Sequence, residues 1–62
     1  MPFIHVQLFE GRTIEQKRAF VEALTKETVR TLACSVDDVE VVFDEIKRSN
    51  WATAGKLHSD SK

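Results

Sequence analysis

The chain has 62 residues, one cysteine and a formal net charge of −1. A chain of about 60 residues forms one domain and buries only about 60% of the surface that its unfolded form exposes, so it is marginally stable alone. Domains of this size are usually reinforced by disulfides, a metal or partner subunits. One cysteine excludes an intrachain disulfide, so we predict a single domain over residues 1–62 that associates with further subunits.

The distribution of charged and apolar residues argues against nucleic acid, membranes and export. Nine basic residues are balanced by ten acidic ones and form no basic run. The apolar stretches are too short to span a bilayer, and no basic region precedes a long apolar core as in a signal peptide. The two histidines show no metal-ligand spacing, so neither a metal nor another cofactor is expected. One free cysteine without an export signal favours the cytoplasm.

Side chains alternate in character with a period of two after the proline at position 2, which predicts a strand over residues 3–9. One face is aliphatic and should meet a helix: Ile4, Val6 and Leu8. The other face is mixed and can line a pocket or a subunit contact: Phe3, His5, Gln7 and Phe9. We interpret His5 as a contact or solvated residue rather than a catalyst.

A long helix is predicted over residues 14–32. Gly11 breaks the strand, and Thr13 with Gln16 three residues later forms a capping box. No glycine or proline interrupts the segment, whose length is about 28 Å at the rise of an α-helix. An apolar stripe is expected to face the sheet: Ile14, Phe20, Val21, Leu24, Thr28 and Leu32.

A second strand is predicted over residues 39–46, after a short connection in which Cys34 is interpreted as a small apolar filler rather than a nucleophile. Strand, helix and strand form a βαβ unit with parallel strands, so the fold class is α/β. Two strands and one helix leave open sheet edges, which again favours association.

The segment after residue 47 has a different composition. Ser49 and Asn50 predict a turn, and a short hairpin is expected between Thr53 and Leu57 with its turn at Gly55. Trp51 cannot be buried by this tail alone, so it must fold back or cover a neighbouring subunit. Residues 58–62 are polar and expected to fray.

Pro2 is the first candidate for chemistry. If Met1 is removed, the ring nitrogen of Pro2 changes from an amide into a secondary amine with an ordinary pKa of roughly 8. Burial beside a cation would lower that pKa, because both disfavour the charged form, and the amine would act as a general base near neutral pH. Taken alone, a proline at this position is more often a stiff start to a strand.

Several stretches together carry a family resemblance. They are Pro2, the run Leu8-Phe9-Glu10-Gly11-Arg12-Thr13, the helix start Glu15-Gln16-Lys17, and in the tail Asn50-Trp51 and Gly55. On these residues the chain resembles the 4-oxalocrotonate tautomerase family of very small enzymes. The resemblance covers nearly the whole chain without an obvious gap.

The resemblance implies an activity and an assembly. Family members lose Met1, and the proline amine moves a proton between carbons of an enol or unsaturated keto acid. They are typically hexamers, built as trimers of dimers from βαβ subunits, with pockets between subunits. The resemblance assigns a substrate carboxylate to Arg12, and it implies that Trp51 of another subunit helps to form an apolar wall around Pro2. We expect Phe3 and Phe9 to shape the apolar part of this site.

The chemistry of Arg12 agrees with the role that the resemblance implies. A guanidinium group offers two parallel hydrogen bonds to a carboxylate, so it would hold the substrate near Pro2 and stabilise enolate charge. Considered without the resemblance, Arg12 is more simply a solvated charge on a loop.

Glu40 is a departure from the family pattern. The diacid isomerases of this family carry a second arginine at the place of Glu40. A carboxylate there would repel a dianionic substrate and, if it lies near the pocket, raise the pKa of the Pro2 amine. The first hypothesis is therefore a homohexameric tautomerase of monocarboxylic 2-oxo acids and their enols. The second is a non-catalytic or partner-dependent subunit of a mixed hexamer, in which the partner supplies the missing arginine.

Overall fold

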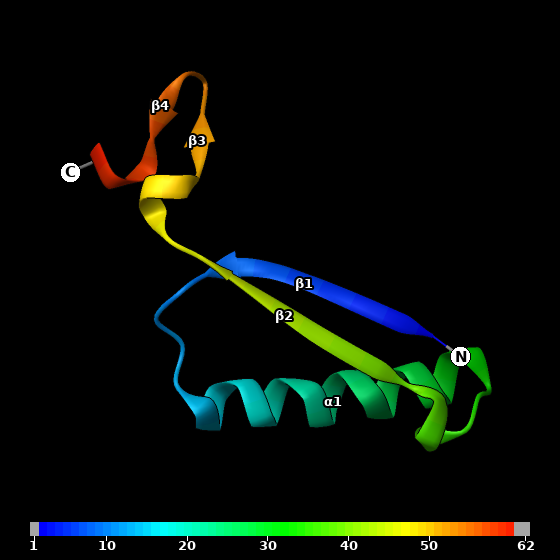
Figure 1. The fold of residues 1–62 in the computed structure, drawn as a ribbon. Coiled ribbons are helices and arrows are strands. Elements are labelled where there is room, and N and C mark those ends of the chain that lie inside the picture. Colours follow the sequence, from blue (N-terminus) through cyan, green and yellow to red (C-terminus); the bar gives the residue numbers. More distant parts are fainter. Residues whose placement is uncertain (1, 61–62) are drawn as a thin grey trace.

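The computed structural model describes residues 2–60. Met1, Ser61 and Lys62 lie outside the described residues, so the expected removal of Met1 and the fraying of the last two residues fall outside them too. Figure 1 shows a βαβ unit followed by a small hairpin. The unit consists of β1 (Phe3–Phe9), α1 (Ile14–Leu32) and β2 (Glu40–Ile46).

The two long strands are parallel, as the sequence predicts. The register pairs Phe3 with Glu40 at one end and Phe9 with Ile46 at the other. The predicted second strand begins one residue too early, because Val39 closes a short 3₁₀ turn, Val36–Asp38, through a hydrogen bond from its N–H to the carbonyl of Val36. The fold class of the chain is α/β.

Helix α1 covers one face of the sheet and begins as its capping residues predict. Thr13 Oγ1 accepts a hydrogen bond from the Gln16 N–H at 3.1 Å, and the Gln16 side chain accepts one from the Thr13 N–H at 2.9 Å. The helix ends at Ala33, whose positive φ of 55° turns the chain toward β2. Ile4, Val6 and Leu8 are less exposed than Phe3, His5 and Gln7, as expected for the face that meets the helix.

The predicted apolar stripe of α1 is only partly correct. In its middle, Val21 and Leu24 are partly sheltered and Phe20 is 45% exposed. Thr28 is the one buried residue among residues 2–60, and its hydroxyl donates to the Leu24 carbonyl at 2.7 Å. Its two ends are not sheltered, since Ile14 is 57% exposed and Leu32 is 62% exposed. The helix extends beyond what two strands can cover, so only its middle packs on the sheet.

The C-terminal segment forms the predicted hairpin and projects away from the βαβ unit (Figure 1). Strands β3 (Ala52–Thr53) and β4 (Lys56–Leu57) are antiparallel. Ala54 and Gly55 between them both have positive φ, 55° and 81°, which matches the right-handed twist of a two-residue hairpin. The 3₁₀ turns Arg48–Asn50 and His58–Asp60 flank the hairpin. The fraying expected from residue 58 onward is therefore wrong for residues 58–60.

The overall shape is extended for such a short chain. The radius of gyration is 14.9 Å, and the extents are 43 × 24 × 14 Å. A compact domain of this length would have a radius of gyration of about 11 Å. No apolar side chain among residues 2–60 is buried. A single chain therefore builds the framework of a domain without a closed core.

Candidate active site

Pro2 lies at the end of the sheet where both long strands begin. Its carbonyl accepts a hydrogen bond of 3.0 Å from the backbone N–H of Glu40, so these two candidate residues are neighbours. Phe3 is paired with Glu40 in the register and is 61% exposed. Side chains alternate along a strand, so Phe3 and Glu40 lie on the sheet face opposite α1. Three of the six predicted site residues therefore meet at this end.

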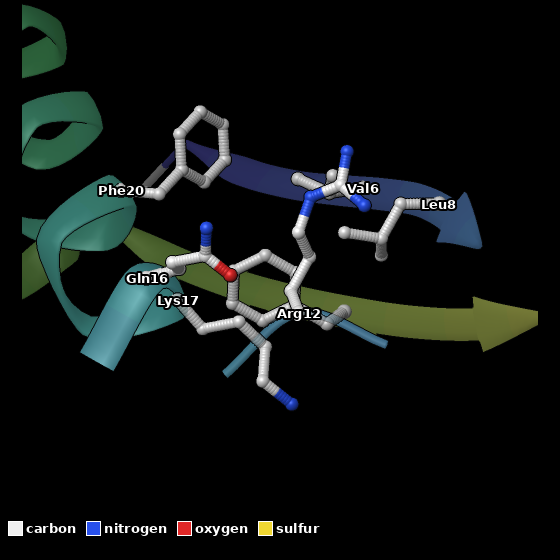
Figure 2. A pocket seen from close by; sticks show the side chains of 7 residues that line it. Val6, Leu8, Arg12, Gln16, Lys17 and Phe20 are labelled. Atoms are coloured by element: carbon white, nitrogen blue, oxygen red, sulfur yellow. The ribbon is translucent and has the colours of Figure 1, made fainter. Parts of the chain in front are cut away.

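Arg12 lies at the other end, in the loop that leads from β1 into α1. Gly11, with a φ of 123°, lets the chain turn out of the strand just before it. Arg12 borders a hollow of about 240 Å³ between the helix start and the sheet (Figure 2). The hollow is lined by Val6, Leu8, Arg12, Gln16, Lys17, Phe20 and Phe43.

The cations around this hollow differ in their partners. Lys17 Nζ donates to Glu45 Oε2 at 2.9 Å, and the two side chains are only 22% and 35% exposed. This pair ties the first turn of α1 to the end of β2. Figure 2 shows the Arg12 guanidinium extending over Val6 and Leu8, away from the Lys17 ammonium. Among residues 2–60, no carboxylate pairs with Arg12, so its guanidinium is available to a ligand.

Phe9 and Trp51 form an aromatic cluster on the sheet face opposite α1, at the same end as Arg12. Their ring centroids are 4.5 Å apart. The ring of His58 lies 5.1 Å from that of Phe9, and its Nε2 shares a hydrogen bond of 2.9 Å with Thr53 Oγ1. The guanidinium carbon of Arg48 lies 4.1 Å from the centre of the Phe9 ring. Trp51 therefore folds back onto its own chain, one of the two outcomes expected for it.

The structure separates the predicted site residues into two groups. Pro2, Phe3 and Glu40 lie at the start of the strands, whereas Phe9, Arg12 and Trp51 lie at their end. The six steps from Phe3 to Phe9 span about 20 Å at the rise of a strand. A proton acceptor at Pro2 and a carboxylate clamp at Arg12 of the same chain are therefore too far apart to act on one small molecule.

Sequence reasoning did not single out Arg48 and His58. The sequence did contain an indication for Arg48, because parallel strands place their carboxyl ends at the same end of the sheet. Arg12 follows the first strand and Arg48 follows the second, so both lie at that end of the sheet. No such pattern marks His58, whose position depends on the hairpin that brings it back to Phe9.

Neither a metal site nor a membrane-spanning helix emerges from the described part of the chain. Residues 2–60 contain no group of three or more histidine, cysteine, aspartate or glutamate side chains that could hold a metal ion. Within the same range, no helix has the length and apolar character needed to cross a bilayer.

Comparisons with known proteins agree with this fold. Residues 2–61 match the family described as tautomerase enzyme. The chain is 40% identical over 60 residues to 2-hydroxymuconate tautomerase of Bacillus subtilis strain 168, covering 97% of both chains. It superposes on YwhB, a homologue of 4-oxalocrotonate tautomerase, with a TM-score of 0.95 and 38% identity, covering 98% of this chain and 100% of the other.

A more distant structure shows how far the fold extends beyond close sequence similarity. The heterohexameric 4-oxalocrotonate tautomerase of Chloroflexus aurantiacus J-10-fl is 21% identical, yet it superposes with a TM-score of 0.92 over 100% of both chains. At that identity the likeness concerns the fold alone. The nearer relatives and the match over residues 2–61 show more, namely that the chain belongs to the tautomerase family, among the homologues of 4-oxalocrotonate tautomerase.

Proposed function

We propose that this chain is the subunit of an oligomeric tautomerase that interconverts the enol and keto forms of 2-oxo acids at sites formed between subunits. One observation carries the proposal: Pro2 and Arg12 lie at opposite ends of a strand about 20 Å long. One end carries the proposed base, Pro2, and the other carries the proposed carboxylate-binding group, Arg12. A site is complete only where the Pro2 end of one copy meets the Arg12 end of another.

The surface of the single chain supports association. Its accessible surface is 4977 Å², whereas a folded monomer of 7.1 kDa exposes about 4,100 Å². The outer edges of β1 and β2 have no strand beside them within residues 2–60, and Phe3 and Val42 stand exposed on the open sheet face. Two copies related by a two-fold axis perpendicular to β1 at its outer edge would place their β1 strands antiparallel, and Pro2 of each would then approach Arg12 of the other. Three such dimers would give the expected homohexamer.

The proposed chemistry needs a base, a carboxylate clamp and an apolar wall. Once Met1 is removed, the Pro2 nitrogen takes a proton from C3 of the keto form, and the oxygen on C2 gains one from water; in the reverse direction the protonated amine gives the proton back to C3. Arg12 of a second copy holds the substrate carboxylate through its two parallel N–H groups. Phe3, Phe9 and Trp51 exclude water, which strengthens both electrostatic contacts.

Glu40 favours a substrate with one carboxylate. Its backbone is hydrogen-bonded to Pro2, so its carboxylate belongs to the Pro2 half of the site. A negative charge there repels a second carboxylate on the substrate. We therefore propose aryl or alkyl 2-oxo acids and their enols as substrates. The relative named 2-hydroxymuconate tautomerase acts on a dicarboxylate by its name, so that compound is the natural competitor in a test.

The deciding experiment combines intact mass with an enol-ketonisation assay on the same sample. A mass that lacks Met1, together with rapid ketonisation of the enol of phenylpyruvate, is the expected result. Pro2→Ala in the same assay should leave only the uncatalysed rate. If Pro2→Ala retained the wild-type rate, the role of Pro2 as the base would be rejected.

A second candidate function is a partner-dependent or non-catalytic subunit of a mixed hexamer. The observation that favours it is Glu40 beside Pro2, at the place where a cationic partner would complete the site. Native mass spectrometry of the protein from its own cells distinguishes the two candidates. A single subunit mass would exclude the mixed assembly, and two masses in equal amounts would support it.

A further inference from the structure

Arg48 stands out because its guanidinium lies against the ring of Phe9, one of the proposed site residues, and pairs with no carboxylate among residues 2–60. Its guanidinium carbon is 4.1 Å from the centre of the Phe9 ring, within the range of a cation–π contact. Phe9 in turn contacts Trp51. Arg48 is therefore built into the aromatic cluster that we assign to the substrate pocket.

The polar edge of this guanidinium is unused. A ring contact engages the flat face of the group, whereas its five N–H donors lie around the rim. Among residues 2–60, neither a carboxylate nor a carbonyl accepts a hydrogen bond from Arg48. Two other cations are paired, Lys17 with Glu45 and Arg30 with Glu27. A stacked guanidinium with a free rim is suited to an anionic oxygen of a ligand.

Arg48 and Arg12 flank the same end of the sheet. Phe9 and Ile46 are paired in the register, and Arg12 follows the first of them by three residues while Arg48 follows the second by two. Arg12 borders the hollow on the helix side, among Val6 and Leu8. Arg48 lies on Phe9, whose side chain is on the opposite face. A molecule bound at this end of the sheet would meet one unpaired arginine from either side.

The reaction generates a negative charge on a substrate oxygen, and an unpaired guanidinium can stabilise that charge. When the Pro2 nitrogen takes a proton from C3 of a 2-oxo acid, the electrons of the C3–H bond form the C2=C3 double bond. The electron pair of the C2=O bond moves onto the oxygen, which later takes a proton from water to give the enol. Until then the oxygen is negative, and a preorganised donor at this point is the largest single contribution in many enzymes.

We propose that Arg48 is a substrate-contacting residue that donates to the oxygen on C2 and stabilises its charge in the enolate. The inference rests on the proposed function, because it needs Pro2 as the base and Arg12 as the carboxylate clamp. It assigns different roles to the two arginines. Arg12 binds the same carboxylate before and during the reaction, whereas Arg48 meets a charge that develops only during proton transfer.

The test compares Arg48→Met with Lys47→Met in the full chain, freed of Met1. Methionine keeps an unbranched apolar side chain over Phe9 while it removes the charge. Loss of a donor to a developing oxyanion should lower kcat by about 100-fold and leave KM within about threefold of the wild-type value. Lys47→Met removes an adjacent exposed charge and should leave both constants unchanged, which controls for the general loss of positive potential.

The outcomes separate this inference from the proposed function. If Pro2→Ala is inactive while Arg48→Met matches Lys47→Met, the role of Arg48 is rejected and the proposed function stands. If Arg48→Met raises KM with kcat unchanged, Arg48 binds the ground state only and the inference is again rejected. If Pro2→Ala is fully active, the proposed function fails first. Assembly is checked by native mass spectrometry, and Arg48→Gln carries the same prediction if the methionine variant does not assemble.

Discussion

The two ends of the β1–β2 sheet are unlike in almost every respect. The starting end holds Pro2 and Glu40, whose backbone N–H donates to the Pro2 carbonyl at 3.0 Å, and the ion pairs formed within residues 2–60 lie elsewhere. The far end holds Arg12 and Arg48, which pair with no carboxylate in the described range 2–60, beside an aromatic cluster. One end can exchange a proton and the other can hold an anion.

This division explains how a chain of only 62 residues can contribute to an active site. A single βαβ unit cannot surround a substrate, but its two ends can carry complementary halves of a site. Closed symmetry brings the unlike ends of different copies together and repeats the site around the assembly. Substitutions at either end, alone and combined, should therefore have distinct effects.

The strongest test asks whether the two halves come from different chains. Pro2→Ala should lower kcat/KM by roughly 1,000-fold or more because it removes the base, and Arg12→Gln by roughly 100-fold or more because it removes the clamp. Co-expressed in equal amounts, the two variants should recover about a quarter of the wild-type activity, because one site in four would draw an intact residue from each chain. Activity is measured on the purified mixed oligomer. No recovery in a mixed oligomer of proven composition would place both residues in one chain.

Arg12→Gln alone tests whether Arg12 binds the substrate carboxylate. We expect kcat/KM for a monocarboxylic 2-oxo acid to fall by about 100-fold or more through a higher KM and misplacement of the substrate. Arg18→Gln is the matched control, because Arg18 is exposed on α1 and does not border the hollow. Steady-state kinetics of the two variants suffice. Equal effects of both substitutions would mean that only the overall charge matters.

Glu40→Gln addresses the proton-exchanging end. A carboxylate near the Pro2 amine favours its protonated form and so raises its pKa, and removing the charge should lower that pKa. The amine is then free at lower pH, so the rising limb of kcat/KM against pH should move to lower pH. Glu22→Gln, on the helix, serves as the control. If the rising limb of kcat/KM did not move, or moved to higher pH, the Glu40 carboxylate would not raise the pKa of Pro2.

The smallest effect concerns the connection that leads from α1 to the Pro2 end. Ala33 has a positive φ of 55°, a conformation that costs an alanine about 1 kcal/mol relative to glycine. Ala33→Gly should therefore stabilise the protein by about 0.5–1 kcal/mol in denaturant unfolding at fixed protein concentration. Ala23→Gly, inside the exposed part of α1, should destabilise it by about 1 kcal/mol. If Ala33→Gly gave no stabilisation while Ala23→Gly destabilised as expected, assembly would be inferred to relax the turn at Ala33.

Much of the fold follows from local sequence patterns. Period-two alternation predicts β1, and the Thr13–Gln16 capping box predicts where α1 begins. Both are local features whose energetics involve residues close in the chain. The exposed ends of the apolar stripe, Ile14 and Leu32, could not be predicted in this way, because the pattern shows which face is apolar but not how much of it one chain can cover.

The candidate site was predictable in its members but not in its arrangement. Pro2 and Arg12 are recognisable by their chemistry and by the resemblance to a family. Their separation follows only from the register of Phe3 with Glu40 and of Phe9 with Ile46. Sequence reasoning did not identify Arg48, because its role depends on a contact with the Phe9 ring, between residues 39 positions apart in the sequence.

The absence of any buried apolar side chain in residues 2–60 has a consequence for the life of a newly made chain. Until it meets its partners, such a chain exposes strand edges and aliphatic surface to proteases and to other unfolded chains. Encounter between copies depends on their concentration, so slow synthesis prolongs this interval and a burst of synthesis shortens it. The steady-state amount of active protein should then rise more steeply than the rate at which the chain is made.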